Sequence, residues 1–387
     1  METTDIVIAG GGAAGLMAAA QAAQRGRKVI LLEKGPSVGE KIRISGGGRC
    51  NFTNIHCAPN RYISKNPHFC KSALARYTQH DFIALVKKHD IAYHEKTLGQ
   101  LFCDGKSQQI IDMLLKECEG ADVRVGQEIN AIDKTDNGFI LDVNGDDIAC
   151  EKLVIATGGP SIPKMGATNY AYEIARQFGH NIITPRAALV PLTFTDDVLN
   201  LARELSGISV DPARVSYEDT SFDEAVLFTH RGLSGPAILQ ISSYWNEGDE
   251  ITVNLCPSFD AFVALKNARK TDGKKQIATL VSQWLPQRIA DKICPAGTIA
   301  DAPDEKLSAV AQKINAWKFK PNGTEGYRTA EVTRGGIDTD EISSKTFESK
   351  KTPGLYFIGE CVDVTGWLGG YNFQWAWSSG WCAGQVL

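Results

Sequence analysis

The chain opens with apolar runs that are separated by glycines. Residues 5–10, Asp-Ile-Val-Ile-Ala-Gly, form a short β-branched run that predicts a buried strand. The Ala-rich residues 16–24 favour a helix, and residues 28–33, Lys-Val-Ile-Leu-Leu-Glu, predict a second strand. Because the glycines stand between the first strand and the helix, the pattern indicates a strand, turn, helix, strand unit of the kind that builds parallel sheets.

The next part of the chain alternates between helical and extended spacing. Residues 107–119 have helical spacing, and residues 123–129 follow as a predicted strand. Residues 139–150 predict a hairpin, because an Asn-Gly pair at 144–145 is a two-residue turn signal. Residues 153–159 then return to the first sheet.

The pattern changes after Pro191. Short alternating strands, such as residues 225–228, predict an inserted β domain, and residues 259–318 become helical and charged. A last strand at 354–359 carries the chain back to the first domain. The expected boundaries are 1–190 and 337–387 for a discontinuous first domain, 191–258 and 319–336 for the β insert, and 259–318 for a helical subdomain within it.

Composition and charge exclude several classes of protein. The 387 residues are 43% hydrophobic and 22% charged, as is usual for a folded domain. A net charge of −4 gives no global basic field, so we expect no nucleic-acid partner. The ten cysteines form no C-x-x-C pair and the histidines show no paired metal spacing, so no metal is expected. No apolar run could span a bilayer, and the segment 6–23 lacks the basic start of a signal peptide; we expect a cytoplasmic protein without a membrane partner.

The first glycine cluster carries the strongest motif. Gly10, Gly12 and Gly15 form G-x-G-x-x-G between the predicted strand and helix. This spacing allows a tight turn and a close backbone approach to a pyrophosphate, which the helix N-terminus then meets with free N–H groups. Glu33 ends the second strand eighteen positions after Gly15, near the position of an acid that binds an adenosine ribose. The sequence therefore predicts a dinucleotide site.

A second glycine cluster follows this unit, and it carries a family resemblance. Residues 39–54 read G-E-K-I-R-I-S-G-G-G-R-C-N-F-T-N. Together with residues 154–161, 228–236 and 354–380, this run resembles the BaiN/YhiN-like bacterial flavoproteins. That family is similar to aminoacetone oxidase and includes reductases of unsaturated steroid-like substrates. The resemblance implies an α/β fold, in which a two-dinucleotide-type (Rossmann-like) FAD-binding domain carries an inserted β-barrel-like domain with a nested helical subdomain.

The resemblance also implies non-covalently bound FAD, with NAD(P)H as a candidate electron donor. Glu360 or Asp363 would accept from the ribityl chain, and a helix starting within 369–372 would point at the flavin ring. Its N-terminus would stabilise negative charge on the reduced ring. The expected FAD-binding residues are Gly10, Gly12, Ala13, Ala14, Gly15, Glu33, Lys34, Lys41, Ser45, Gly46, Gly47, Gly48, Arg49, Cys50, Asn51, Glu128, Ile129, Thr157, Gly158, Gly159, Gly359, Glu360, Asp363, Gly370, Tyr371, Asn372 and Phe373.

Direct hydride exchange at flavin N5 is the expected chemistry. The chain has neither a second G-x-G-x-x-G nor a redox cysteine pair, which a dedicated NAD(P)H domain or a disulfide reductase would need. His230 and Arg328 are the candidate catalytic residues, because they could hold a carbonyl or carboxylate oxygen. For His230 the alternative is a loop and cap before a helix at Pro236. For Arg328 it is an ion pair with Glu325 or Glu331.

Several functions remain open on the sequence. The first is an FAD-dependent oxidoreductase of a small organic substrate, either an NAD(P)H-linked reductase of carbonyl or enone compounds or an oxidase of small amines. An alternative is an FAD-binding redox sensor that docks a protein partner through its helical subdomain. A third, a tRNA-modifying flavoprotein, needs a basic face. Only one local cluster favours it: Lys266, Arg269, Lys270, Lys274 and Lys275.

Overall fold

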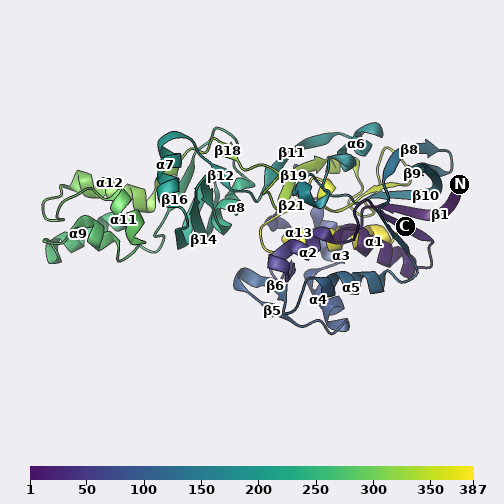
Figure 1. Ribbon diagram of the computed structural model, residues 1–387, viewed down its shortest axis with the longest axis horizontal. Coiled ribbons are helices and arrows are strands. Elements are labelled where there is room, and N and C mark those ends of the chain that lie inside the picture. The colour runs from purple at the N-terminus through teal and green to yellow at the C-terminus, as the bar shows by residue number, and fades with distance from the viewer. The chain divides into compact units, whose positions relative to one another are not determined.

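The computed structural model describes residues 1–387, which form two compact units (Figure 1). The first unit contains residues 1–186 and 332–387, and the second contains residues 187–331. The chain leaves the first unit once and returns to it, so residues far apart in sequence share one core. None of the helices combines the length and the apolar character that crossing a bilayer requires.

A seven-stranded sheet forms the centre of the first unit. Strand β1 (Glu2–Ala9) pairs in parallel with β2 (Val29–Glu33) on one side and with β10 (Asp146–Ile155) on the other. The apolar half of β1 is fully buried, as its β-branched sequence predicts. Strand β20 (Leu355–Phe357) pairs in parallel with β10 and brings the last part of the chain into this sheet. The remaining strands are β7 (Asp122–Val125), β8 (Ile129–Thr135) and β9 (Gly138–Val143).

Two helices pack closely beside this sheet. Helix α1 (Ala13–Gln24) connects β1 to β2, and α13 (Tyr371–Gly384) packs against it. The packing depends on Gly380, where a Cβ atom would lie 2.5 Å from the Ala14 carbonyl oxygen. The other helices of the unit are α2 (Glu40–Gly48), α3 (Cys70–Arg76), α4 (Gln79–Lys88), α5 (Gln108–Glu117) and α6 (Tyr170–Gln177). Its short strands are β3 (Asn51–Asn54), β4 (Tyr62–Ile63), β5 (Tyr93–Glu95), β6 (Gln100–Cys103), β11 (Ile182–Ala188), β19 (Val332–Ile337) and β21 (Thr365–Gly366).

The second unit is built on an antiparallel sheet of seven strands. Its pairings follow the order β17-β16-β13-β14-β15-β12-β18. Helix α8 (Pro236–Ser242) packs on β13 and β14, and α7 (Asp196–Glu204) contacts β14 and β15. The strands are β12 (Leu192–Thr193), β13 (Ser209–Tyr217), β14 (Thr220–Thr229), β15 (Gly232–Ser234), β16 (Ile251–Asn254), β17 (Trp317–Phe319) and β18 (Gly323–Thr324).

A helical segment lies between two neighbouring strands of this sheet. Strands β16 and β17 pair with each other, yet the chain forms four helices between them. Helix α9 begins after Asp260, whose carboxylate accepts hydrogen bonds from the backbone N–H groups of Phe262 and Val263. Leu265 and Leu307 are fully buried where α9 and α12 pack together. The helices are α9 (Ala261–Thr271), α10 (Ile277–Val281), α11 (Gln287–Ile293) and α12 (Asp304–Asn315).

Two local predictions have different outcomes. The hairpin is confirmed: Asn144 and Gly145 both have positive φ and join β9 to β10. The single strand predicted over 123–129 is wrong, because the chain turns at Gly126, where φ is +68°, and β8 begins only at Ile129. The turn places Gly126 N–H 2.9 Å from the Gly35 carbonyl oxygen, so this segment still lies beside the end of β2.

Candidate functional site

The glycine turn between β1 and α1 is tight on one side and open on the other. A Cβ at Gly15 would lie 1.9 Å from the Gly10 carbonyl oxygen, and a Cβ at Gly10 would lie 2.7 Å from that of Ala156. Both positions therefore require glycine for packing. A Cβ at Gly12 would meet nothing within 4 Å. The protein thus leaves open space at the N-terminus of α1, where the first N–H groups of a helix are free to bind an anion.

The end of β2 is fixed to this turn by a carboxylate. Glu33 accepts hydrogen bonds from Gly11 N–H at 2.8 Å and from Gly35 N–H at 2.7 Å. On the neighbouring segment, the Lys34 ammonium pairs with Glu128 at 2.5 Å, and both side chains are exposed. The structure therefore brings Glu33, Lys34 and Glu128 to the same edge of the sheet as the glycine turn.

A charged network joins α2 to the returning chain. Lys41 donates to Glu360 Oε2 at 2.7 Å and to Ser161 Oγ at 2.7 Å. Glu360 Oε1 in turn accepts from the Ser161 hydroxyl at 2.8 Å and from Thr333 N–H at 2.9 Å. Burial raises the pKa of Glu360, but the Lys41 ammonium and these hydrogen bonds more than offset it, so the pKa lies below its usual value. Glu360 is therefore an ionised carboxylate whose oxygens already have protein partners.

Asp363 occupies a different position from Glu360. Its Oδ2 accepts from Lys65 N–H at 2.8 Å, and the residue is buried. Burial holds the pKa of Asp363 above its usual value. Glu360 and Asp363 are the two acids that were expected to accept from the ribityl chain. Both already accept hydrogen bonds from the protein.

The second glycine cluster ends α2 in left-handed backbone. Gly46, Gly47 and Gly48 all have positive φ, and α2 is kinked there. Cβ atoms at Gly47 and Gly48 would meet nothing within 4 Å, so this backbone also faces open space. Ser45, Arg49 and Asn51 flank the kink. Cys50 is fully buried with a strongly raised thiol pKa, which makes it a structural thiol rather than a redox-active one.

The end of β10 contains a buried polar atom without a partner. The hydroxyl of Thr157 is buried and makes no hydrogen bond. Such an atom costs free energy unless a ligand or water satisfies it. Gly158 beside it has a φ of +71°, and a Cβ at Gly159 would lie 2.7 Å from the Thr333 hydroxyl oxygen. This orphaned hydroxyl, in the turn predicted to contact the cofactor, fits a bound group that supplies its hydrogen bond.

Helix α13 begins as predicted, directly after Gly369 and Gly370. Gly370 has a φ of +94°, and a Cβ there would lie 2.4 Å from the Thr53 carbonyl oxygen. The Asn372 side chain closes the preceding loop by accepting from Gly366 N–H at 2.8 Å and donating to its carbonyl oxygen at 2.9 Å. Trp375 and Trp377 of this helix are buried in the core.

Taken together, the residues of the first unit fit a flavin dinucleotide. The open glycine turn at α1 suits the pyrophosphate, Glu33 and Glu128 would lie beside the adenosine, and the turn at Thr157 and the start of α13 suit the ring. Sequence reasoning missed the role of Ser161 and Thr333 in holding Glu360. Ser161 stands in the same motif as Thr157 and could have been found there, whereas Thr333 has no sequence signal, because it reaches Glu360 only through the placement of β19.

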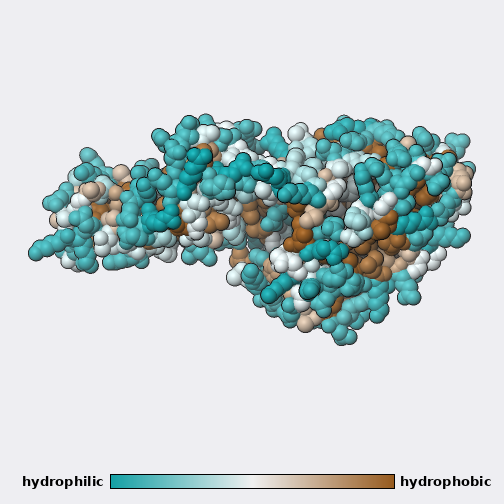
Figure 2. All heavy atoms as spheres, in the orientation of Figure 1, coloured by the Kyte–Doolittle hydropathy of each residue, from teal (hydrophilic) through white to brown (hydrophobic).

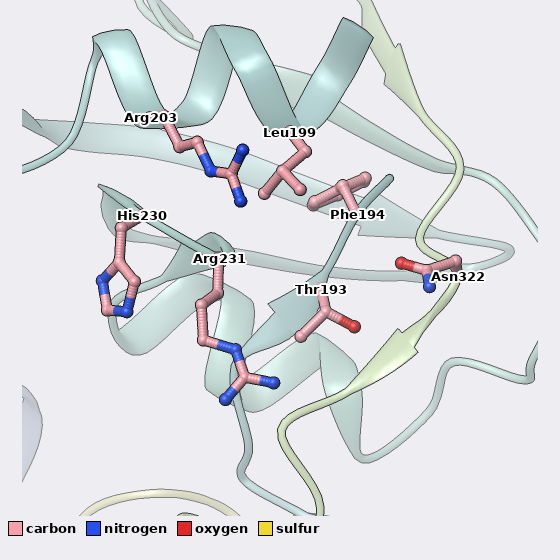
Figure 3. A pocket seen from close by; sticks show the side chains of 7 residues that line it. All are labelled: Thr193, Phe194, Leu199, Arg203, His230, Arg231 and Asn322. Carbon is pink, nitrogen blue, oxygen red and sulfur yellow. The ribbon is translucent and has the colours of Figure 1, made fainter. Parts of the chain in front are cut away.

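The two catalytic candidates lie in the second unit. His230 is exposed on the turn between β14 and β15, and the helix expected at Pro236 does begin there, capped by Gly235. Arg328 is exposed and pairs with neither Glu325 nor Glu331; Glu325 instead lies 3.7 Å from Arg231. His230 contributes to a hollow of about 430 Å³ (Figure 3), which is lined by Thr193, Phe194, Leu199, Arg203, His230, Arg231 and Asn322.

Comparisons with known proteins find a matching family and several named relatives. Residues 4–386 match the family described as HI0933-like protein Rossmann domain. The chain is 52% identical to the ribosomal RNA dihydrouridine synthase of Escherichia coli K12, over 100% of this chain and 98% of that protein. It is 28% identical to the 3-dehydro-bile acid delta(4,6)-reductase of Clostridium scindens, over 98% of both. Among solved structures, 3-ketosteroid-delta4-(5alpha)-dehydrogenase from Rhodococcus jostii shares the fold, with a TM-score of 0.52 and 15% identity over 99% of this chain and 97% of that one.

Proposed function

Because the chain belongs to the HI0933-like Rossmann-domain family, we propose that it reduces a uridine base of ribosomal RNA to dihydrouridine. The chain is an FAD-dependent oxidoreductase with a Rossmann-type FAD-binding domain. The observation that carries the choice of substrate is the 52% identity, over the full length, to a protein named for this reaction. Dihydrouridine is uridine whose C5–C6 double bond has gained a hydride and a proton.

The proposed reaction suits the chemistry of the first unit. Bound FAD would supply the hydride at N5. The open backbone at Gly12 and the α1 N-terminus would bind its pyrophosphate, and the unpaired hydroxyl of Thr157 would donate a hydrogen bond to its flavin ring. The N-terminus of α13 would stabilise negative charge that develops beside it. Glu360, already ionised and held by Lys41, would keep α2 and the returning chain in register around the cofactor.

The local charge of the helical segment supports an RNA substrate. Residues 259–318 hold ten Lys and Arg against six Asp and Glu, a net charge of +4, although the whole chain carries −4. Asp304 is shared by Lys266 and Arg269, whereas Lys270 and Lys274 are exposed with no carboxylate partner. Figure 2 shows that hydrophilic residues cover most of the visible face of this segment. The net charge of the whole chain, from which we expected no nucleic-acid partner, therefore does not describe residues 259–318, which are basic.

A second candidate is the reduction of a small conjugated enone, the class expected from the sequence. The 28% identical relative is named as a reductase of a 3-dehydro bile acid, and uracil and such a ketone share a carbon–carbon double bond conjugated to a carbonyl. The amine oxidase and the sensor remain predictions from the sequence alone.

The test of the proposed function is a gene deletion with complementation. Ribosomal RNA from a strain lacking the protein should contain less dihydrouridine by mass spectrometry, and a plasmid copy should restore it. Complementation by the flavin-site variant Gly12→Val should fail. Unchanged dihydrouridine in the deletion strain would overturn the RNA substrate and favour the small enone.

A further inference from the structure

The hollow in the second unit is held by backbone contacts from four segments. It lies where β12, α7, the turn after β14 and the residue before β18 meet (Figure 3). Phe194 N–H donates to the Arg231 carbonyl oxygen at 3.2 Å, and Asn322 N–H donates to that of Thr193 at 3.0 Å. Within the turn, Thr229 Oγ1 accepts from Gly232 N–H at 3.1 Å. These bonds fix the walls, so the hollow is formed before any ligand binds.

The charged side chains that line the hollow are two arginines. Arg203, His230 and Arg231 line it and are exposed, and no carboxylate is among the lining residues. The side chain of Arg203 makes no hydrogen bond or ion pair with the protein. Arg231 has one distant partner, since its Nε lies 3.7 Å from Glu325, and its terminal N–H groups remain available. Two guanidinium groups with free donors beside one hollow are the usual way in which proteins bind phosphate.

Arg214 of the same unit differs from Arg203, because its guanidinium is paired with a carboxylate. Arg214 is also exposed, but its Nε lies 2.6 Å from Asp223 Oδ1 and its Nη2 lies 2.6 Å from Oδ2, in a two-bond pair. A guanidinium used in this way has few donors left for a ligand. The guanidinium of Arg203, by contrast, keeps its donors available for a ligand.

The remaining lining residues suit a nucleotide around the phosphate. Leu199 is half-buried and Phe194 is buried, so this part of the lining is apolar, while Thr193 and Asn322 offer a hydroxyl and an amide beside it. An apolar floor, an amide and guanidinium groups are the combination that binds single-stranded RNA. We propose that this hollow binds a backbone phosphate and its nucleotide in the RNA substrate, with Arg203 and Arg231 as the phosphate ligands. This inference rests on the proposed function.

An RNA strand is a polymer with many phosphates, and most contacts between proteins and nucleic acids go to phosphate and sugar, where they position the strand. A phosphate site formed by side chains of residues 187–331 suits such a substrate.

The test is RNA binding by the full-length, FAD-loaded protein. Arg203→Ala and Arg231→Ala should each weaken binding of a fluorescein-labelled ribosomal RNA fragment by about tenfold in anisotropy. Each should also reduce the salt slope of log Kd by roughly 1, the value for one phosphate contact. Arg214→Ala is the matched control and should bind like the wild type. FAD content and the rate of flavin reduction by NADPH should stay unchanged in all three variants.

The outcomes separate this inference from the proposed function. Wild-type affinity in both variants, or an equal loss in Arg214→Ala, would overturn the phosphate site while leaving the RNA reaction intact. A raised KM for NADPH with unchanged RNA affinity would also overturn it, because the ligand would then be the dinucleotide donor. Absence of dihydrouridine formation by the wild type would refute the proposed function itself, whatever the binding result.

Discussion

Lys41 and Glu360 are 319 positions apart in sequence, yet the Lys41 ammonium lies 2.7 Å from Glu360 Oε2. Lys41 belongs to helix α2, and Glu360 follows strand β20 in the last part of the chain. The ion pair therefore joins the two parts of the first unit, which residues 187–331 separate in the sequence. It also places one partly buried charge pair beside the residues that fit the flavin.

We expect Lys41→Met to destabilise the first unit. The substitution leaves the Glu360 carboxylate without its cation, which should lower the free energy of unfolding by about 1–3 kcal/mol. Urea denaturation followed by circular dichroism measures this. Lys34→Met is the control, because its exposed pair with Glu128 should contribute about 0–1 kcal/mol. Equal losses of stability in the two variants would show that the partly buried pair contributes no more than an exposed one.

Acid should destabilise the protein through Glu117. Burial alone would raise its pKa, but hydrogen bonds from Lys88, His89 and Gln24 lower the pKa to about 2. A depressed folded-state pKa stabilises the protein above the ordinary value of 4.5, and this contribution is lost as the pH falls from 4.5 to about 2.

We therefore expect Glu117→Gln to be less stable than the wild type at pH 7 and to lose less stability on acidification. Thermal unfolding at pH 7 and pH 3 measures both effects. The exposed Glu119→Gln is the matched control and should follow the wild type. A Glu117→Gln curve parallel to the wild type across this range would contradict the pKa shift.

Substitutions at Gly12 and at Gly15, two of the three motif glycines, should have different effects. Gly12→Val should fold normally, because its Cβ meets no protein atom, but should lose bound FAD, because the pyrophosphate would occupy that space. Gly15→Val should lose the fold, since its Cβ would meet the Gly10 carbonyl oxygen at 1.9 Å. The flavin absorbance per protein and the circular dichroism spectrum distinguish the two. Normal flavin content in a folded Gly12→Val would refute the placement of the cofactor.

The basic helical segment should contribute to RNA affinity independently of the hollow. Replacing both Lys270 and Lys274, which have no carboxylate partner, with Ala should weaken RNA binding several-fold at low salt and less at high salt. The control is Lys318→Ala, because Lys318 lies 3.5 Å from Glu250. Anisotropy titrations at two salt concentrations measure the effect. Identical affinities for the double variant and the wild type would remove this segment from the RNA-binding surface.

The sequence predicts local features better than long-range ones. The strand, glycine turn and helix at 5–24 and the Asn144-Gly145 hairpin follow from periodicity and turn chemistry, which act within a few residues. The sequence did not predict that the strand ends before Gly126. The backbone of Gly126 forms a hydrogen bond with Gly35, which is far away in the sequence, and local patterns do not show such a contact. Glu360 is bound by Lys41 of α2 and Thr333 of β19, which come together only in the folded unit. No local sequence pattern predicts these contacts.

The central claim is tested most directly by a single turnover without oxygen. The FAD-loaded protein would be reduced with dithionite and mixed with ribosomal RNA from a strain that lacks the protein, while flavin absorbance is followed and the RNA is analysed by mass spectrometry. We predict that the RNA accelerates flavin reoxidation and gains one dihydrouridine per flavin oxidised. A flavin that stays reduced with RNA but is reoxidised by a small conjugated enone would contradict the account.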